Sequence, residues 1–287
     1  MTALRVFVPR DAAARAVGAD RVAAAIRDEA NRLGRAVEIV RTGSRGLFWL
    51  EPLVEVATPT GRLAFGPVTP GDVAGLFAGY SPFAGSHPLC LGNPEEIPFL
   101  KRQTRITCAR CGIVDPLSLD DYRMQGGLRG LERARSLGSA GTLAEVTTSG
   151  LRGRGGAGFP TGIKWKTVAD TPADRKYIVC NADEGDSGTY ADRMILEGDP
   201  FVLIEGMIIA GLAVGAGKGY VYIRSEYPDA VRTFAEALVV AEGAGLLGRT
   251  AGFEIELRVG AGAYVCGEET SLLESLEGRR GQVRAKP

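Results

Sequence analysis

Short apolar segments alternate regularly with helical patterns in the C-terminal half of the chain, and this alternation most constrains the fold. Tyr177–Cys180, Tyr220–Arg224 and Phe253–Val259 have the length and apolar character of strands. Helical patterns over 201–214 and 229–241 separate them. Strands that alternate with helices predict an α/β fold with a mostly parallel sheet. Ligands of such sheets bind beyond the carboxyl ends of the strands.

The N-terminal residues 1–79 predict a smaller α/β unit. The pattern indicates strands at 4–8 and 37–40, a hairpin from 53–56 and 62–65, and helices at 11–33 and 69–77. Residues 80–98 contain four prolines and two glycines, so we expect an extended linker or docking arm. The remainder, 99–287, is expected to form a ligand-binding domain, with helices after Pro116 and over 142–149, 164–168 and 271–276.

Charge and hydropathy exclude several classes of function. The chain has 34 basic and 34 acidic residues, so nothing indicates binding to nucleic acid or an anionic membrane. No apolar run is long enough to span a bilayer, so direct membrane insertion is not expected. The first residues lack the pattern of a signal peptide, which favours a cytoplasmic protein.

The five cysteines and the single histidine leave few catalytic or metal sites open. Cys108 and Cys111 form a Cys-Ala-Arg-Cys motif that could be redox-active, half of a metal site, or merely structural. No second pair follows at zinc-site spacing, which favours the structural interpretation. His87 is the one candidate base for a nucleophile, but nothing nearby would orient it.

Three polar or glycine-rich loops carry the chemistry. The first, Gly153–Trp165, has four glycines within six residues, which let the backbone approach a ligand closely, and its free N–H groups suit a phosphate. The second follows the strand at 177–180 with Asn181, Asp183, Glu184 and Asp186. These groups could bind a metal, accept hydrogen bonds from ribityl and ribose hydroxyls, or form a solvated acidic turn.

The third loop is Gly260–Ser271. Gly260 and Gly262 again permit close approach to a ligand. Glu268 and Glu269 open a helix, where acidic residues also serve as caps, and Tyr264 supplies a flat ring with a hydroxyl. The ligand-binding and capping interpretations both remain open.

Together the segments GLRGRGGAGFPTGIKW, CNADEGDSGTYADR, ILEGDPFVLIEGM and GAGAYVCGEETSLLESLEGRRGQVRAKP resemble the flavoprotein subunit of NADH:quinone oxidoreductase and its relatives. The relatives include the diaphorase subunits of NAD-reducing hydrogenases and of soluble NAD-dependent formate dehydrogenases. The resemblance covers about residues 98–287 and, with the EGDSGTY variant, is greatest to the formate dehydrogenase beta subunit. It implies a Rossmann-like domain that binds FMN and NADH.

Residue by residue, the resemblance implies one shared pocket with no catalytic side chain and no metal. The residues placed around FMN are Gly153, Arg154, Gly155, Gly156, Lys164, Asn181, Asp183, Glu184, Tyr264, Gly267, Glu268 and Thr270. NADH would stack on the flavin, with Phe159 against adenine and with Glu269 and Lys286 in the nicotinamide nucleotide pocket.

Two positions depart from the family's pattern in ways that bear on the nucleotide. Asp186 stands where the family often has Glu, and a carboxylate there accepts bonds from ribose hydroxyls and repels a 2′-phosphate, which favours NAD over NADP. Thr167 replaces a common second aromatic residue, so adenine stacking would be weaker.

The N-terminal unit resembles a thioredoxin-like ferredoxin domain. Ser44 and Phe48 stand at its ligand positions, and because an Fe–S cluster needs thiolates, we expect a docking or structural unit without a cluster. The family continues beyond Pro287 with a further FMN loop, a ubiquitin-like domain and a four-cysteine 4Fe–4S site, so we expect the flavin domain to be truncated here, without the ligands of that cluster.

The resemblance therefore implies an oxidoreductase, namely an FMN-dependent NADH dehydrogenase (diaphorase) module of a multi-subunit enzyme. In the formate dehydrogenase setting its partners would be a thioredoxin-like gamma subunit with a 2Fe–2S cluster and an alpha subunit with molybdenum and Fe–S centres. The alternatives are the homologous subunit of respiratory complex I or of an NAD-reducing hydrogenase, and a non-catalytic assembly fragment.

Overall fold

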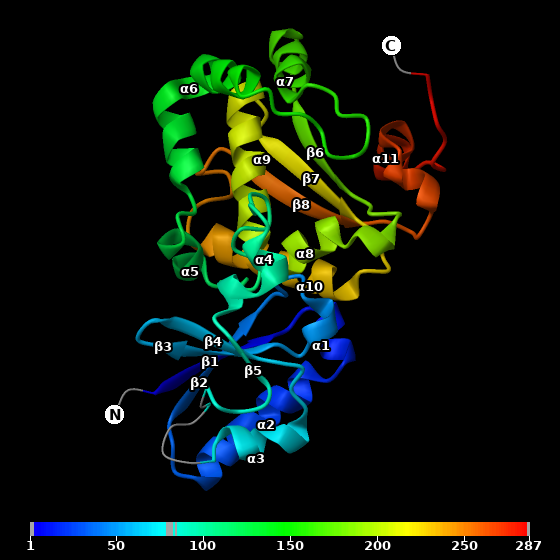
Figure 1. Cartoon of the computed structure of the whole chain (residues 1–287). Helices are drawn as coiled ribbons and strands as arrows, with labels where there is room; N and C mark the ends of the chain where they lie inside the picture. Colours follow the sequence, from blue (N-terminus) through cyan, green and yellow to red (C-terminus); the bar gives the residue numbers. More distant parts are fainter. Residues whose placement is uncertain (1–2, 79–82, 84, 286–287) are drawn as a thin grey trace. The chain divides into compact units, whose positions relative to one another are not determined.

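The computed structural model describes residues 3–78, 83 and 85–285. The chain divides into two compact units (Figure 1). The first consists of Met1–Ser118 with Glu197–Asp199, and the second of Leu119–Leu196 with Pro200–Pro287. The boundary between the compact units therefore follows Ser118, whereas the sequence placed boundaries at residues 79 and 98.

The first unit contains a five-stranded mixed sheet in the order β2-β1-β3-β4-β5. β1 and β2 are parallel, and the other neighbours are antiparallel. The predicted strands and the hairpin are confirmed. β5 lies inside the segment expected to be an extended linker and pairs with β4. The strands are β1 (Leu4–Pro9), β2 (Val37–Thr42), β3 (Val54–Thr58), β4 (Gly61–Phe65) and β5 (Cys90–Gly92).

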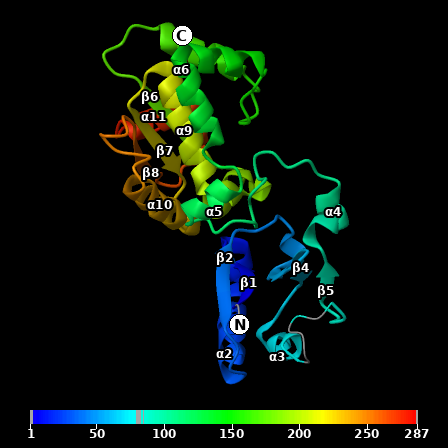
Figure 2. The same ribbon diagram turned by 90° about the vertical axis from the view of Figure 1, so that its left-hand side faces the viewer.

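Helices α2 and α3 contribute to the core of the first unit, and Figure 2 shows them with the strands of this unit. Val22, Ile26 and Ala30 of α2 are buried in this core. The single helix expected over 11–33 was wrong, because Gly18 takes a left-handed conformation (φ +104°) and divides it in two. The helices are α1 (Ala12–Ala16), α2 (Ala19–Arg32), η1 (Phe48–Leu50), η2 (Pro70–Asp72), α3 (Val73–Leu76), η3 (Pro94–Glu96) and α4 (Pro98–Lys101).

The second unit contains a parallel sheet in the order β6-β7-β8, as the alternation of strands and helices predicted. Its strands are β6 (Tyr177–Ala182), β7 (Lys218–Ile223) and β8 (Glu254–Val259). Their arrowheads point to one edge of the sheet, from which the loops to α8 and η5 leave (Figure 1). This is the edge where the sequence placed its polar loops.

The apolar helix α9 covers one face of this sheet. Gly219 of β7 lets it approach, because a Cβ there would lie 2.7 Å from the methyl carbon of Met207. The helices of this unit are α5 (Leu119–Met124), α6 (Arg129–Thr148), α7 (Thr161–Asp170), η4 (Ser187–Thr189), α8 (Ala191–Gly198, whose last residues belong to the first unit), α9 (Pro200–Val214), α10 (Pro228–Gly243), η5 (Tyr264–Gly267) and α11 (Glu269–Leu276).

Glu205 shows how a carboxylate is tolerated inside α9. It is buried and accepts hydrogen bonds from the backbone N–H groups of Leu128 (2.8 Å) and Leu131 (2.9 Å) and from the hydroxyl of Tyr122. These bonds anchor the start of α6, which is longer than the helix predicted over 142–149 and breaks at Gly138. Each buried N–H group gains a partner that water would otherwise supply.

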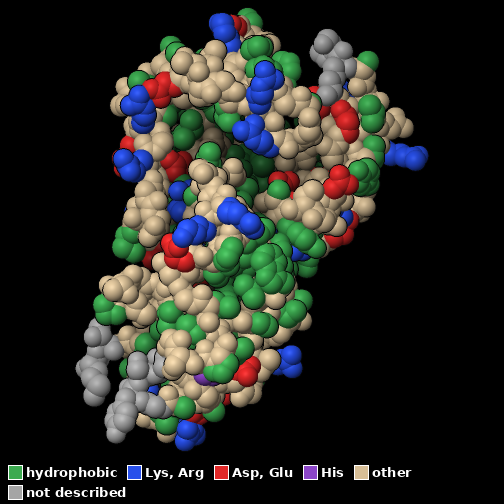
Figure 3. All heavy atoms as spheres, in the orientation of Figure 1, with side chains coloured by type: hydrophobic (Ala, Val, Ile, Leu, Met, Phe, Trp, Pro, Cys, Tyr) green, Lys and Arg blue, Asp and Glu red, His purple; other side chains and the backbone are tan. Residues whose placement is uncertain are grey.

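Two surface properties bear on the expected environment. None of the helices in the described part of the chain is long and apolar enough to cross a bilayer. Basic and acidic side chains are interspersed over the drawn face of each unit (Figure 3).

Candidate functional site

The first loop connects α6 to α7, and residues 153–158 form its glycine tip. The Gly153 N–H donates to the Phe159 carbonyl (2.9 Å), and the Thr161 N–H donates to the Leu151 carbonyl (2.8 Å). Two strand-like residues, Arg152 and Pro160, face each other at its base. Backbone hydrogen bonds therefore fix the base of the loop, whereas its glycine tip is exposed to solvent.

The glycines of the tip leave empty space above the backbone. A Cβ added at Gly155, Gly156 or Gly158 would meet no heavy atom within 4 Å. Gly156 (φ +99°) and Gly158 (φ +59°) also need the left-handed region, which side chains disfavour. The tip leads directly into the N-terminus of the ten-residue helix α7, whose dipole favours an anion. An exposed backbone of this kind fits a phosphate-bearing ligand.

The second loop leaves the carboxyl end of β6. The Asn181 side-chain amide donates to the Gly267 carbonyl of the third loop (2.8 Å), and its oxygen accepts from the Asp183 N–H (3.1 Å). Asp183 is half-buried, and this burial raises the pKa of its carboxyl. The amide therefore joins the ends of β6 and of the loop after β8.

The third loop packs on the second through an aromatic ring. The ring of Tyr264 lies against Gly185, where a Cβ would come within 2.6 Å of the ring edge. The Tyr264 hydroxyl lies 3.4 Å from the Asp186 carboxylate. Tyr264 is nevertheless 71% exposed, so one face of its ring is available to a planar ligand.

Lys164 links the first loop to the third. Its ammonium on α7 lies 3.4 Å from the Glu269 carboxylate at the start of α11. Both side chains are largely exposed, so the pair contributes little to stability and its cation remains accessible to an anionic ligand. The second and third loops thus meet at the carboxyl edge of the sheet, as predicted, and Lys164 connects the helix after the first loop to them.

Two predicted site carboxylates have other contacts in the structure. Glu184 is buried and accepts from the Ala191 N–H (2.6 Å) and Arg193 N–H (3.2 Å) at the start of α8. Glu268 is the N-cap of α11 and accepts from the Thr270 N–H (2.8 Å) and Ser271 N–H (3.1 Å). Both hold helix termini at the rim of the site, which is the capping role left open for the third loop.

Four predicted residues remain to be placed. Phe159 is 52% exposed on the glycine tip, where its ring is accessible to solvent. Arg154 also lies on the exposed tip, and Thr270 is buried, with its hydroxyl accepting from the Arg284 N–H (2.9 Å). Lys286 lies outside the described residues.

Arg224, just beyond the end of β7, is a site residue that the sequence reasoning missed. Its guanidinium donates to the carbonyls of Glu184 and Gly185 and so supports the second loop from beneath. The sequence does show a charged residue at the end of an apolar strand. It does not show that Arg224 binds the loop after β6, because this depends on the pairing of β6 with β7.

The metal interpretation of the second loop has no support in this geometry. Within the part of the chain that the structure describes, no group of three or more His, Cys, Asp or Glu side chains is arranged to hold a metal ion. The carboxylates of this loop are instead divided between a helix terminus and the surface.

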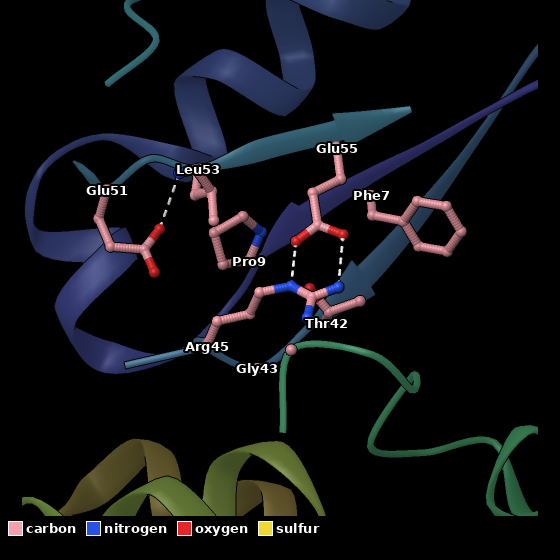
Figure 4. Close-up of a pocket in the computed structure, with 9 residues that line it drawn as sticks. Phe7, Pro9, Thr42, Gly43, Arg45, Glu51, Leu53 and Glu55 are labelled. Carbon is pink, nitrogen blue, oxygen red and sulfur yellow. Dashed lines mark hydrogen bonds and ion pairs between the residues drawn. The ribbon is translucent and has the colours of Figure 1, made fainter. Parts of the chain in front are cut away.

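A buried ionic cluster lies in the first unit beside Ser44, one of the two positions at which the resembling family carries cluster ligands (Figure 4). Arg45 forms a bidentate ion pair with Glu55, and Arg62 adds a second cation 3.2 Å from Glu55. Ser44 donates to Glu51 (2.7 Å), whose pKa is raised to about 8 by burial and by Asp11. The cavity among them is only about 10 Å³, room for about one water molecule.

The matches with known proteins concern the second unit above all. Residues 146–287 match the family described as the Nuo51 FMN-binding domain. This domain supports FMN as a cofactor, and the open glycine tip and the exposed Lys164 fit a flavin phosphate.

Relatives and solved structures extend this similarity. The chain is 50% identical over 192 residues to the HndC subunit of the NADP-reducing hydrogenase of Solidesulfovibrio fructosivorans (65% of this chain, 39% of HndC). It is 50% identical over 175 residues to an NADH-quinone oxidoreductase subunit of Aquifex aeolicus (59% of this chain, 41% of the relative). It thus spans about two fifths of these relatives. The fold resembles an NAD⁺-reducing [NiFe]-hydrogenase in the H2-reduced state (TM-score 0.53, 28% identity, 99% of this chain, 47% of that chain).

Proposed function

We propose that the three loops bind FMN and NAD(H) and that this chain is the NADH dehydrogenase (diaphorase) module of a multi-subunit oxidoreductase. The open glycine tip carries the proposal, because an accessible backbone leads there into a helix N-terminus and into Lys164, whose ammonium reaches Glu269 after the third loop. FMN, when bound, exchanges a hydride with nicotinamide and single electrons with an Fe–S chain. The protein's own residues position the two ligands.

Each loop has a distinct task in this proposal. Gly153, Arg154, Gly155 and Gly156 contact the flavin phosphate together with Lys164, while Asn181 and Asp183 face its polar groups. Tyr264, Gly267 and Thr270 close the flavin side, with Glu184 and Glu268 holding the two helix starts that shape it. Phe159 and Glu269 border the nucleotide, with Lys286 in the same pocket, and Asp186 accepts from the adenosine ribose.

The domain division belongs to the same proposal. Residues 1–79 would be a thioredoxin-like docking unit, 80–98 a connecting arm that adds β5 to its sheet, and 99–287 the cofactor domain, of which the part up to Ser118 belongs to the first compact unit. The parallel β1–α2–β2 unit followed by the β3–β4 hairpin and α3 supports the thioredoxin-like assignment.

We further propose formate as the electron source, with a 2Fe–2S gamma subunit and a molybdenum-containing alpha subunit as partners in the cytoplasm. The EGDSGTY segment supports this assignment. The similarity to hydrogenase subunits favours a second candidate, in which dihydrogen supplies the electrons. Assaying the native complex for formate-, dihydrogen- and quinone-linked reduction of NAD⁺ separates these partners.

A spectrum of the purified chain tests the cofactor proposal. After incubation with FMN and gel filtration, we expect flavin absorption bands that bleach when NADH is added without oxygen. The Lys164→Gln variant should retain less FMN, whereas Lys166→Gln on the same helix, paired with Asp170, should retain as much as the unaltered chain. A colourless chain that NADH leaves unchanged would contradict the proposal and favour a non-catalytic assembly role.

A further inference from the structure

The Cys108–Cys111 pair lies in the first unit and takes no part in the proposed flavin site. All five cysteines fall within the described ranges, and none is in a disulfide. The Cys111 N–H donates to the Cys108 carbonyl (3.2 Å), which closes a turn. Such a turn brings its first and last Cα atoms within about 7 Å, and a disulfide needs about 4.4–6.8 Å. The turn thus brings the two cysteines close to the Cα separation that a disulfide needs.

The two thiols differ in exposure. Cys108 is partly exposed and follows Ile106 and Thr107, both of which are exposed. Cys111 is fully buried against Gly198, where a Cβ would lie 3.5 Å from its sulfur. The thiols hydrogen-bond to one another. An accessible thiol beside a shielded one is the arrangement that thiol–disulfide exchange requires.

The surrounding charges also distinguish the two sulfurs. The hydrogen bond from Cys111 and the cation of Arg105 lower the pKa of Cys108 to about 7, despite partial burial. The same hydrogen bond, burial and the Asp199 carboxylate raise the pKa of Cys111. Asp199 is itself buried and bonded to Arg110 (2.8 Å). Cys108 is therefore the nucleophile of the pair, and Cys111 the resolving thiol.

We propose that Cys108 and Cys111 are a dithiol site that reduces small disulfides by exchange. The Cys108 thiolate attacks one sulfur of the substrate disulfide, forms a mixed disulfide and releases one thiolate. Cys111 then loses its proton and attacks the Cys108 sulfur, releasing the second thiolate. One substrate disulfide becomes two thiols, and the protein gains one disulfide, so two electrons and two protons leave the pair.

The reaction of the whole chain with 5,5′-dithiobis(2-nitrobenzoate) tests this proposal. At pH 7 we expect a fast phase, at least about tenfold faster than the reaction of the partly buried Cys90, that releases two thionitrobenzoates per chain. Peptide mass spectrometry should then show a Cys108–Cys111 disulfide. The proposal would be overturned if, in the unaltered chain, Cys108 and Cys111 carried mixed disulfides with thionitrobenzoate and formed no disulfide with each other.

Variants assign the two roles. Cys111→Ser, or Cys111→Ala if the former is unstable, should release only one thionitrobenzoate in the fast phase and keep the other on Cys108. Cys108→Ser should lose the fast phase, and the matched Cys90→Ser control should keep it. A fast phase that survives Cys108→Ser, or that still releases two equivalents from both Cys111 variants, would overturn the assignment.

Discussion

The two polar regions of the molecule, one in each unit, differ in what their charged groups face. At the sheet edge of the second unit, Lys164 and Glu269 are largely exposed and the glycine tip has empty space around it. In the first unit, Arg45 and Glu55 are buried and bonded to each other (Figure 4). A site for a ligand leaves polar groups accessible, whereas an internal ionic cluster satisfies its own members. The following changes test that distinction.

Breaking the internal cluster should have the largest effect. Arg45→Met leaves Glu55 buried with only Arg62 beside it, so we expect the first unit to lose about 3–5 kcal/mol of stability. The double variant Arg45→Met/Glu55→Leu should recover much of this lost stability, because it leaves no buried carboxylate without its partner. Urea unfolding in a Trp165→Phe background, where Trp49 alone reports on the first unit, measures both. Equal stability of Arg45→Met and the unaltered chain would contradict a structural role.

The buried Glu51 should make the first unit less stable as pH rises. The unfolded chain releases this proton near the ordinary pKa of 4.5, whereas the folded chain holds it to about pH 8. The folded state thus binds the extra proton within this window, and stability falls with rising pH. Glu51→Gln should remove the dependence and stabilise the unit by about 1–3 kcal/mol at pH 8. If Glu51→Gln has the same dependence of stability on pH as the unaltered chain, the carboxyl of Glu51 is not its cause.

Closing the open glycine tip should weaken the ligand site without unfolding the chain. Gly156→Ala adds a side chain where the backbone is left-handed (φ +99°), so we expect FMN affinity to fall about tenfold, about 1.4 kcal/mol. Gly245→Ala introduces the same kind of strain (φ +70°) after α10 and is the matched control. Quenching of FMN fluorescence measures both. Equal losses in the two variants would show that strain, not ligand contact, is responsible.

Removing the carboxylate of Asp186 should have the smallest effect. Because its charge would repel a 2′-phosphate, Asp186→Ser should relax the preference for NADH over NADPH about fivefold, as expected for an exposed charge of up to about 1 kcal/mol. Steady-state reduction of a dye by each nucleotide gives the ratio, and Asp170→Ser on α7 serves as a charge-matched control. An unchanged ratio for Asp186→Ser would contradict its assigned role.

Local patterns predicted most of the strands and the edge at which the polar loops gather. Apolar periodicity located β6, β7 and β8, and glycine spacing located the open tip, because both depend on neighbouring residues. The break of the long N-terminal helix at Gly18 was not predicted, since a single glycine is also tolerated within a helix. The strand β5 was hidden among prolines and required β4 as its partner.

By itself, the sequence determined the α/β class, the parallel sheet and the position of the second and third loops at the carboxyl ends of its strands. Only the tertiary structure decided which polar side chains remain accessible to solvent and which are already bonded within the protein. Glu184 and Glu268 cap helix starts, Arg224 supports a loop, and Arg45 is enclosed with Glu55. The physical reason is that a polar group's role depends on whether its partner is protein or solvent, and distant segments supply that partner.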